Sequence, residues 1–375
     1  MARWSVRFRT LFVIQIARAR PEPRRHFSSY AFGQSHTSVQ PANRYVVPDT
    51  PAIDATVMDR RQTALLRIGQ ALLENGYRFI TPTPATHARV LGRRKVAHSA
   101  SLTDIFGWSR SFLPGDLAPE LLDRLDRAGA LTWRDGRLSS AVRFSSIGAL
   151  LVVHSAYPTR SSNAVFFGPD TYRFARAIAE VRAGDRDFAP HVVVDIGAGT
   201  GAGGLLAAAL FPGARKVVLA DINDQALALS EVNAALNGVS VAQGLRSDVL
   251  GAFEGSADLI VSNPPYLVDE EQRAYRHGGG PWGCDLAIRI VTEGMERLSG
   301  DGKFLLYTGT PVVGGTDMFL EAVRPHLERT TAAYRYEELD PDVFGEELDR
   351  PPYDRADRIA AVMLLIDAED IRGKS

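Results

Sequence analysis

The sequence predicts an α/β protein in which helices cover both faces of a mostly parallel sheet. From about residue 165 onward, short apolar runs alternate with stretches whose apolar residues recur at helical spacing, and such alternation specifies a parallel sheet. Val192–Asp195 begins with three valines in a row, as a strand buried on both faces requires. Two late runs, Thr330–Tyr336 and Ile359–Ile366, are separated by prolines without a helical pattern, so we expect them to pair antiparallel.

The other strands and helices of this region follow from the same periodicities. The remaining expected strands are 216–220, 239–245, 257–261 and 303–307. The expected helices are 203–210, 224–237, 285–298 and 316–327. Together these elements make up a predicted domain of residues 161–375.

Length and composition limit the class of protein. A chain of 375 residues suggests about two domains. The formal net charge of −1 gives no whole-protein attraction to nucleic acid. The single cysteine, Cys284, excludes an internal disulfide framework and a multi-cysteine zinc site, so we predict a reducing, cytoplasmic location. No apolar run approaches the roughly 18 residues of a membrane span, so we expect no membrane partner.

Residues 1–48 differ in composition from the rest of the chain. They contain eight arginines and a single acid, Glu22. Three interpretations are open: a basic tail without fixed structure or a start site placed too far upstream, a presequence over residues 1–30 that would make the location mitochondrial, or a nucleic-acid-binding arm. We therefore leave this segment out of the fold prediction.

Residues 49–160 are expected to form a small accessory domain of helices followed by strands. Two helices are expected at Arg61–Asn75 and Leu117–Ala128, where leucines recur on one face. A hairpin is expected around the Asp135-Gly136 turn, followed by one strand at Phe144–Val153. This order suggests a winged-helix-like module, which either covers one end of the sheet or recognises the substrate.

The first strand of the large domain ends in a glycine-rich loop, Asp195-Ile-Gly197-Ala-Gly199-Thr-Gly201, which leads into a helix. Glycine lets the backbone turn sharply and approach a ligand closely. The Gly-x-Gly-x-Gly spacing and the leading Asp195 depart from the dinucleotide pattern, in which a helix end holds a pyrophosphate. An acid at this place favours a cationic sulfonium nucleoside, and a tight turn without a ligand is the alternative.

Two further acids follow the next two strands. Asp221, about 20 residues past the glycines, is placed to accept hydrogen bonds from ribose hydroxyls. Its alternative role is a helix N-cap, which Asn223 or Asp224 would fill equally well. Asp248 is placed to accept from an adenine amino group, or else it caps its loop. All these strand ends meet at one crevice, where open α/β sheets bind ligands.

The strand at 257–261 leads into Asn263-Pro264-Pro265-Tyr266. The two prolines fix the backbone and remove two N–H donors, so carbonyls dominate the local polar surface. The side-chain carbonyl of Asn263 and the backbone carbonyl of Pro264 can hold both hydrogens of an NH2 group on a planar carbon. Tyr266 can pack against the flat target. The arrangement orients the nitrogen for in-line attack on a methyl group, and a plain strand-end turn is the alternative.

The glycine loop, Asp221 and the Asn-Pro-Pro-Tyr motif, in this order, resemble the class I methyltransferases that modify amino nitrogens. HemK-type release-factor glutamine methyltransferases and the small-domain methyltransferases of ribosomal RNA are similar over about residues 165–310. Phe167-Gly-Pro-Asp-Thr171-Tyr resembles the segment before strand one in these families, where an acidic-Thr motif contributes to the donor pocket. The resemblance implies a Rossmann-like seven-stranded sheet with an antiparallel C-terminal hairpin, S-adenosylmethionine as cofactor, and Asn263 as the catalytic residue.

The motifs and the resemblance together define a candidate site without a metal. The predicted catalytic residues are Asn263, Pro264 and Tyr266. The predicted donor-binding residues are Asp195, Gly197, Gly199, Gly201, Asp221, Asp248, Asn263 and Thr171. Each lies at or near the expected carboxyl edge of the sheet.

The acceptor is open between several classes. A protein glutamine, in a release factor or ribosomal protein, is favoured, and the exocyclic amino group of a base in RNA or DNA is the alternative. A small-molecule amine and a catalytically silent relative are further interpretations, whereas the Asn-Pro-Pro-Tyr motif disfavours an NAD-dependent oxidoreductase. The N-terminal domain does not obviously match the helical bundle of release-factor enzymes. The glycine-rich stretch 275–285 is either a mobile lid or a connection before a helix.

Overall fold

The computed structural model describes residues 58–93, 99–273, 275–329 and 333–368. All of them belong to one compact unit, Val46–Ser375. The predicted tail of residues 1–48 lies outside the described residues, so its three interpretations stay open. Within the described part of the chain, no helix combines the length and the apolar character that crossing a membrane requires.

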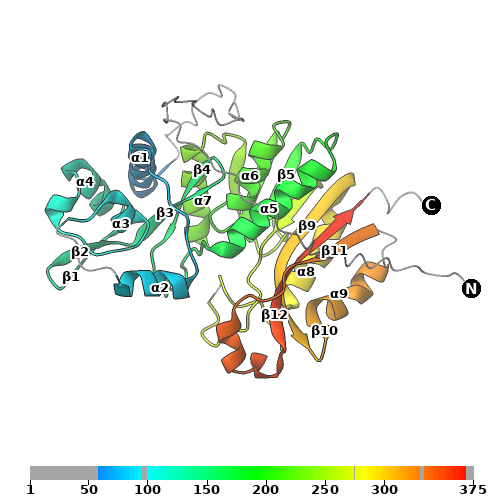
Figure 1. The fold of residues 1–375 in the computed structure, drawn as a ribbon. Coiled ribbons are helices and arrows are strands. Elements are labelled where there is room, and N and C mark those ends of the chain that lie inside the picture. The colour runs from blue at the N-terminus through cyan, green and yellow to red at the C-terminus, as the bar shows by residue number, and fades with distance from the viewer. Residues whose placement is uncertain (1–57, 94–98, 274, 330–332, 369–375) are drawn as a thin grey trace, which may run out of the picture. The chain divides into compact units, whose positions relative to one another are not determined.

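A central sheet of eight strands organises the described residues (Figure 1). Seven of them follow one another in the order β11 (Ala333–Asp340), β12 (Arg358–Asp367), β9 (Leu298–Val313), β8 (Ala257–Ser262), β5 (Val192–Ile196), β6 (Lys216–Asp221) and β7 (Ala242–Arg246). Strands β5 to β9 run parallel, whereas β12 is antiparallel to both β9 and β11. The short β10 (Thr316–Asp317) pairs with β9. The predicted mostly parallel, seven-stranded sheet with an antiparallel C-terminal pair is confirmed.

Helices cover both faces of this sheet. On one face, α5 (Pro169–Gly184) and α6 (Ala202–Leu210) share an apolar core with Val193. On the other, α8 (Asp285–Arg297) and α9 (Met318–Arg329) share a core with Val194. Adjacent residues of a strand point to opposite faces, which places the two valines in different cores. The apolar run in β5 is therefore explained by burial on both sides.

Several boundaries differ from the sequence prediction. Helix α5 was not predicted, although Phe174, Ile178 and Val181 have helical spacing and are buried. Strand β7 begins later than expected because Gly238 (φ +68°) ends α7 (Asp224–Leu236) with a bond from the next N–H back into the helix. Strand β9 is far longer than predicted, and α9 begins at residue 318 because β10 occupies the two residues before it.

Among the described residues, four α-helices and two hairpins precede α5. They are α1 (Arg60–Glu74), α2 (Pro84–Arg93), α3 (Leu102–Phe106), α4 (Pro119–Arg127), β1 (Leu131–Arg134), β2 (Arg137–Ser140), β3 (Val142–Ile147) and β4 (Leu150–Ser155). Helices α1 and α4 and the β1–β2 hairpin agree with the prediction. The single strand predicted at 144–153 is wrong, because the chain reverses at Gly148 (φ +58°) to pair β3 with β4. Both strands are almost fully buried, and Gly148 alone marks the exposed two-residue turn between them.

Two asparagines of α7 fasten the β3–β4 hairpin to the large domain. The Asn233 carboxamide accepts from the Val153 N–H at 2.7 Å and donates to the Val153 carbonyl oxygen at 3.0 Å. Asn237, one turn later, pairs in the same way with Leu151 at 3.0 and 2.8 Å. These side chains replace a neighbouring strand along the edge of β4, where backbone groups would otherwise lack partners. Asn233 also donates to the carbonyl oxygen of Thr200 at 2.9 Å, which ties the hairpin to the glycine loop.

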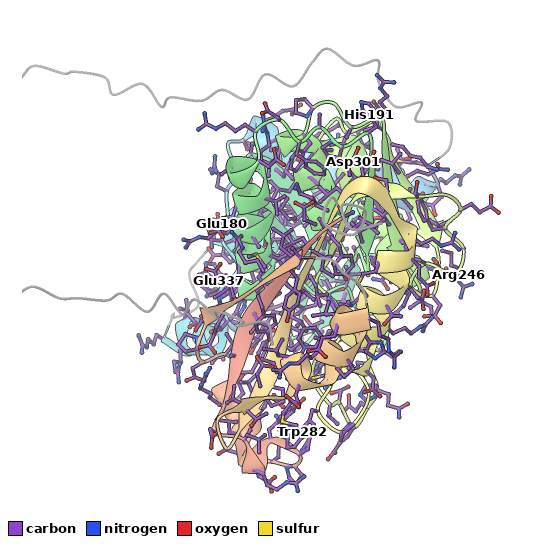
Figure 2. All side chains as sticks on the ribbon, turned by 90° about the vertical axis from the view of Figure 1, so that its right-hand side faces the viewer. Glu180, His191, Arg246, Trp282, Asp301 and Glu337 are labelled. Atoms are coloured by element: carbon purple, nitrogen blue, oxygen red, sulfur yellow. The ribbon has the colours of Figure 1, made fainter. Side chains whose placement is uncertain are left out.

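The parallel strands all end at one edge of the sheet. Figure 2 shows His191 and Asp301, near the starts of β5 and β9, at one end of the molecule, and Trp282, in the loop after β8, at the other. The short helices η2 (Gly345–Asp349) and η3 (Tyr353–Arg355) contact that loop. Open α/β sheets bind ligands at this carboxyl edge.

Replacing Asn233 by alanine should lower the free energy of unfolding by about 2–4 kcal/mol, because backbone groups of Val153 and Thr200 lose their partners in a buried site. Urea unfolding measures this change. Gln243→Ala, at an exposed position of β7, is the control and should change it by less than about 0.5 kcal/mol. Equally small changes for both variants would contradict the role given to the amide.

Candidate functional site

A cavity of about 490 Å³ opens at the carboxyl edge of the sheet. This volume lies in the range of small-molecule and cofactor sites. Its walls come from the loops after β5, β6, β7 and β8, from the start of α5, and from the segment between β11 and β12. With one exception, every residue of the predicted site lines it. The exception is Gly201, which faces inward, since an added Cβ would lie 3.1 Å from Ser230.

The glycine loop has the backbone that its sequence predicts. Gly197, Gly199 and Gly201 have φ angles of +66°, +55° and +76°, a left-handed region that favours glycine. The Gly199 N–H donates to Oδ2 of Asp221 at 2.8 Å, so the loop is held by the end of the neighbouring strand. The first two glycines expose their backbone to the cavity, and the third turns the chain into α6.

Asp195 lies beneath this loop and is 2% exposed. Its Oδ2 accepts from the Gly204 N–H at 2.8 Å. Burial raises the pKa of the Asp195 carboxyl to about 7; the bond from Gly204 opposes this shift and the neighbouring Asp221 adds to it. Sequence reasoning missed Gly203 and Gly204, although they follow the loop directly. A Cβ at Gly203 would lie 2.9 Å from the carboxylate, so α6 approaches β5 only because this side chain is absent.

Asp221 ends β6 and uses both carboxylate oxygens locally. Oδ2 holds the glycine loop and Oδ1 accepts from the Asn223 N–H at 2.9 Å. Burial raises the pKa of Asp221. The alternative role as N-cap of α7 is wrong, because Asn223 is the cap and accepts from Gln225. Each oxygen retains a lone pair for a ligand hydroxyl.

Ile222 is a site residue that sequence reasoning missed. Its side chain is 54% exposed and lines the cavity beside Asp221. A flat ring of a ligand can pack against a large apolar side chain that is exposed in a cavity. The available signal was a lone apolar residue between two polar ones directly after a buried strand.

Asp248 and Thr171 also line the cavity, at separate places. The Asp248 carboxylate is paired with Arg289 of α8 at 2.9 Å, near the surface. Thr171 lies in the first turn of α5, where its hydroxyl contacts the Gly168 N–H at 3.5 Å. Its neighbour Asp170, the acid of the same motif but not one of the predicted site residues, is buried and accepts from the Tyr307 hydroxyl at 2.7 Å. Burial raises the pKa of Asp170.

The Asn263–Tyr266 segment forms the floor of the cavity. The Ser262 hydroxyl donates to the Ile196 carbonyl oxygen at 2.8 Å, which fixes the end of β8 against β5. Asn263 is half-buried and lines the cavity, and its carboxamide has no hydrogen bond within the described part of the chain. Tyr266 is 7% exposed; its ring packs against Gly309, where an added Cβ would lie 2.3 Å away. The free carboxamide is therefore the polar group available to an acceptor.

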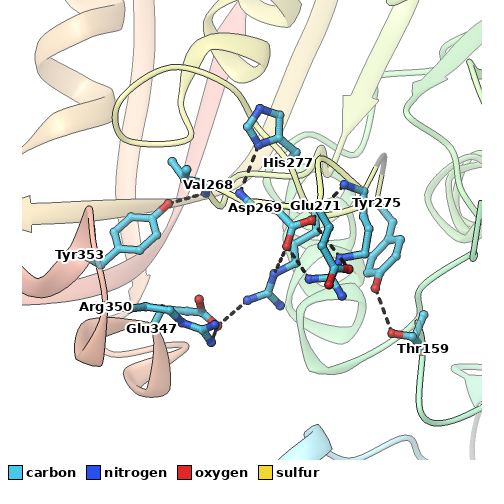
Figure 3. Close-up of polar contacts among 11 residues, drawn as sticks. Thr159, Val268, Asp269, Glu271, Tyr275, His277, Glu347, Arg350 and Tyr353 are labelled. Atoms are coloured by element: carbon cyan, nitrogen blue, oxygen red, sulfur yellow. Dashed lines mark hydrogen bonds and ion pairs between the residues drawn. The ribbon is translucent and has the colours of Figure 1, made fainter. Parts of the chain in front are cut away.

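An ion-pair network joins the loop after this motif to η2 (Figure 3). Asp269 pairs with Arg273 and, at 3.3 Å, with Arg276. Arg276 also pairs with Glu347 of η2, which is 4% exposed and shared with Arg350. The hydrogen bonds from Arg273 lower the pKa of Asp269 to about 2. The predicted lid is thus held at its start by ion pairs, and whether it moves stays a prediction.

The donor half of the cavity suits a cation better than a pyrophosphate. The glycine loop and the segments after β6 and β7 contribute Asp195, Asp221 and Asp248 to the lining and no lysine or arginine. Two phosphates there would meet the carboxylates of Asp195 and Asp221, which form no ion pair among the described residues, whereas a sulfonium nucleoside would be attracted. The residues therefore fit S-adenosylmethionine. Within the described residues, no cluster of His, Cys, Asp and Glu has the arrangement of a metal site.

A family model described as methyltransferase small domain matches residues 184–312 of this chain. The matched segment includes the glycine loop, Asp221, Asp248 and the Asn263–Tyr266 floor of the cavity. For this segment, the predicted resemblance to small-domain methyltransferases is confirmed.

Three curated relatives belong to the same class and differ in acceptor. A release factor glutamine methyltransferase of Deinococcus radiodurans is 36% identical over 124 residues, covering 30% of this chain and 44% of the relative. A ribosomal protein L11 methyltransferase of Thermoanaerobacter is 36% identical over 114 residues, covering 30% of each chain. A ribosomal RNA small subunit methyltransferase C of Sodalis glossinidius is 44% identical over 84 residues, covering 22% and 23%. The chain spans less than half the length of each.

Asp221→Ala should weaken binding of S-adenosylhomocysteine by about 1–3 kcal/mol, roughly 5- to 150-fold, because a ligand acceptor and the anchor of the glycine loop are both lost. Isothermal titration calorimetry measures the affinity. Asp224→Ala, three residues on and mostly exposed, is the matched control and should bind as the wild type does. An unchanged affinity for the Asp221 variant would remove this residue from the donor site.

The raised pKa of Asp195 should make stability depend on pH. Its pKa of about 7 in the folded protein exceeds the ordinary value of 3.8, so folding favours the protonated carboxyl. The resulting stabilisation is present below pH 3.8 and is lost as pH rises through 7. Relative to Asp195→Asn, the wild type should lose unfolding free energy between pH 4 and pH 8, measured by urea unfolding. A difference that does not vary with pH would show that the carboxyl is ionised throughout.

Proposed function

We propose that the methyltransferase small domain at residues 184–312 transfers a methyl group from S-adenosylmethionine to the side-chain nitrogen of a protein glutamine. One observation carries this proposal: the unengaged Asn263 carboxamide lies in the same cavity as the glycine loop. Around it, backbone carbonyls of two consecutive prolines supply acceptors and no N–H donors. A planar NH2 group needs such acceptors for its two hydrogens.

The side chains assist the reaction mainly by orientation. When bound, S-adenosylmethionine supplies a methyl carbon whose bond to sulfur breaks as the acceptor nitrogen attacks it. The Asn263 side-chain oxygen and the Pro264 carbonyl hold the two N–H groups and stabilise the positive charge that develops on nitrogen. The Tyr266 ring packs against the planar acceptor group. The methylated nitrogen then loses its proton to water.

The charge of the cavity favours an amide of a protein over a base of a nucleic acid. Six carboxylates line it against three guanidinium groups, so a nearby phosphate backbone would be repelled. The carboxylates are Asp170, Asp195, Asp221, Asp248, Glu346 and Glu347, and the guanidinium groups belong to Arg273, Arg276 and Arg350. Relatives named release factor glutamine methyltransferase and ribosomal protein L11 methyltransferase add support for a protein acceptor.

Asn263→Ala should reduce methyl transfer at least 100-fold, roughly 3 kcal/mol of transition-state stabilisation, because one of two oriented acceptors is removed. Donor affinity should stay within about twofold, since the glycine loop and Asp221 are untouched. Transfer of tritiated methyl groups and calorimetry measure the two quantities. Gln243→Ala is the control for both. Loss of donor binding equal to the loss of transfer would refute the catalytic role.

The acceptor class is tested with tritiated S-adenosylmethionine and cell lysate treated with protease or with RNase. The proposal expects label that vanishes with protease and survives RNase. Label lost to RNase alone would transfer the assignment to the amino group of a base. If neither sample is labelled although donor binding is confirmed, a small-molecule amine is the remaining acceptor class.

A further inference from the structure

Unpaired basic side chains gather on the accessory side of the cavity. The sequence has five basic residues and no acid in 75–103, and three basic residues and no acid in 136–169. Four described arginines of these segments are exposed and form no ion pair among the described residues. Arg78 donates to the Gly148 carbonyl oxygen at 3.3 Å, and the other three are Arg89, Arg93 and Arg160. We call these three the accessory rim.

Contacts place this rim beside the acceptor half of the cavity. Helix α2 begins at Pro84, which lines the cavity. The His87 ring of α2 stacks on Tyr157 at 4.1 Å, so the loop that carries Arg160 packs against this helix. In the same loop, the Thr159 carbonyl accepts from the Tyr275 hydroxyl at 3.0 Å, and Tyr275 also lines the cavity. Arg89 lies about 8 Å along the helix axis from the cavity wall.

An acidic segment contributes another part of the cavity lining. Residues 337–349 contain seven acids and no basic residue. Five of these acids are exposed. Glu337 and Glu338 pair with arginines, and we call the other three, Asp342, Glu346 and Asp349, the C-terminal rim. Glu346 lines the cavity. The buried Glu347, paired with Arg276, holds this segment beside the acceptor floor (Figure 3). Figure 1 shows α2 and the turns between β11 and β12 at the same lower end of the view.

We propose that the accessory rim and the C-terminal rim together select a polypeptide acceptor that is acidic on one flank of the methylated residue and basic on the other. The inference rests on the proposed function and adds the charge pattern of the polypeptide that carries the methylated glutamine. A nucleic acid carries negative charge on both flanks, so it would gain at the accessory rim and lose at the C-terminal rim. A polypeptide can carry opposite charges within a few residues, and the rims then fix its orientation across Asn263.

Binding of short labelled peptides tests this selection. The probes are Glu-Glu-Glu-Ser-Gln-Ser-Lys-Lys-Lys, the same residues in reverse order, versions with both flanks acidic, basic or neutral, and a single-stranded RNA. Fluorescence anisotropy is measured at low ionic strength with S-adenosylhomocysteine present, because screening weakens exposed charge interactions. One of the two bipolar peptides should bind at least tenfold more tightly than every other probe.

Charge-reversal variants then test which residues cause the peptide preference. Arg89→Glu combined with Arg93→Glu and Arg160→Glu should abolish the preference, and so should Asp342→Lys combined with Glu346→Lys and Asp349→Lys. All six positions are exposed, so the variants should fold. Arg134→Glu, at a side chain 90% exposed on the β1–β2 turn, is the matched control and should keep the preference.

Three outcomes overturn the inference: equal affinity for neutral and bipolar peptides, no measurable binding of any peptide, or tightest binding of the RNA or the all-acidic peptide. The last would indicate a polyanionic partner. These failures are separate from failure of the proposed function, which is judged by turnover of Asn263→Ala. If Asn263→Ala is inactive but the peptides show no charge preference, only the inference about the two rims is wrong. If Asn263→Ala remains active, the proposed chemistry is wrong.

Discussion

The carboxamide of Asn233 is the interaction on which the rest of this structure depends. It pairs with both backbone groups of Val153 and reaches the Thr200 carbonyl, so one side chain joins the accessory hairpin, α7 and the glycine loop. An amide can do this because it offers donors and an acceptor at one point. Without it, the edge of β4 would face an apolar helix with unsatisfied backbone groups. The glycine loop and the β3–β4 hairpin are therefore held in a fixed position relative to each other.

The cavity combines two electrostatic environments. Among the described residues, the donor-half carboxylates Asp195 and Asp221 form no ion pair and burial raises the pKa values of both, whereas Asp248 pairs with Arg289. Its acceptor half contains arginines that are neutralised by Asp269 and Glu347. A cationic donor is thus attracted to one half, while the other half presents neutral carbonyl acceptors to a neutral amide. This division follows from which strand ends carry the acids and which loops carry the arginines.

Agreement between sequence and structure was best where local chemistry and burial gave the same answer. The β1–β2 hairpin was predictable because Asp135 and Gly136 both adopt positive φ, which few residue pairs tolerate. The β3–β4 hairpin was not, because its two-residue turn, Gly148-Ala149, lies between the buried apolar residues Ile147 and Leu150 and contains no Asp, Asn or Pro. Gly201 was predicted to contact the ligand, but it faces inward and turns the chain into α6. Ile222 was not predicted, because the exposure of its side chain depends on the cavity around it.

The sequence by itself determined the sheet, the glycine loop and the order of the polar strand ends, because strand periodicity and glycine conformations are local properties. Only the tertiary structure decided that Asp269 and Arg276 form one network at the acceptor mouth with Glu347, which lies 71 residues after Arg276 in the chain. It also decided that Pro84, in a segment free of acids, and Glu346, in a segment free of basic residues, line the same cavity. Charge partners are chosen by packing between distant segments, and no local pattern encodes them.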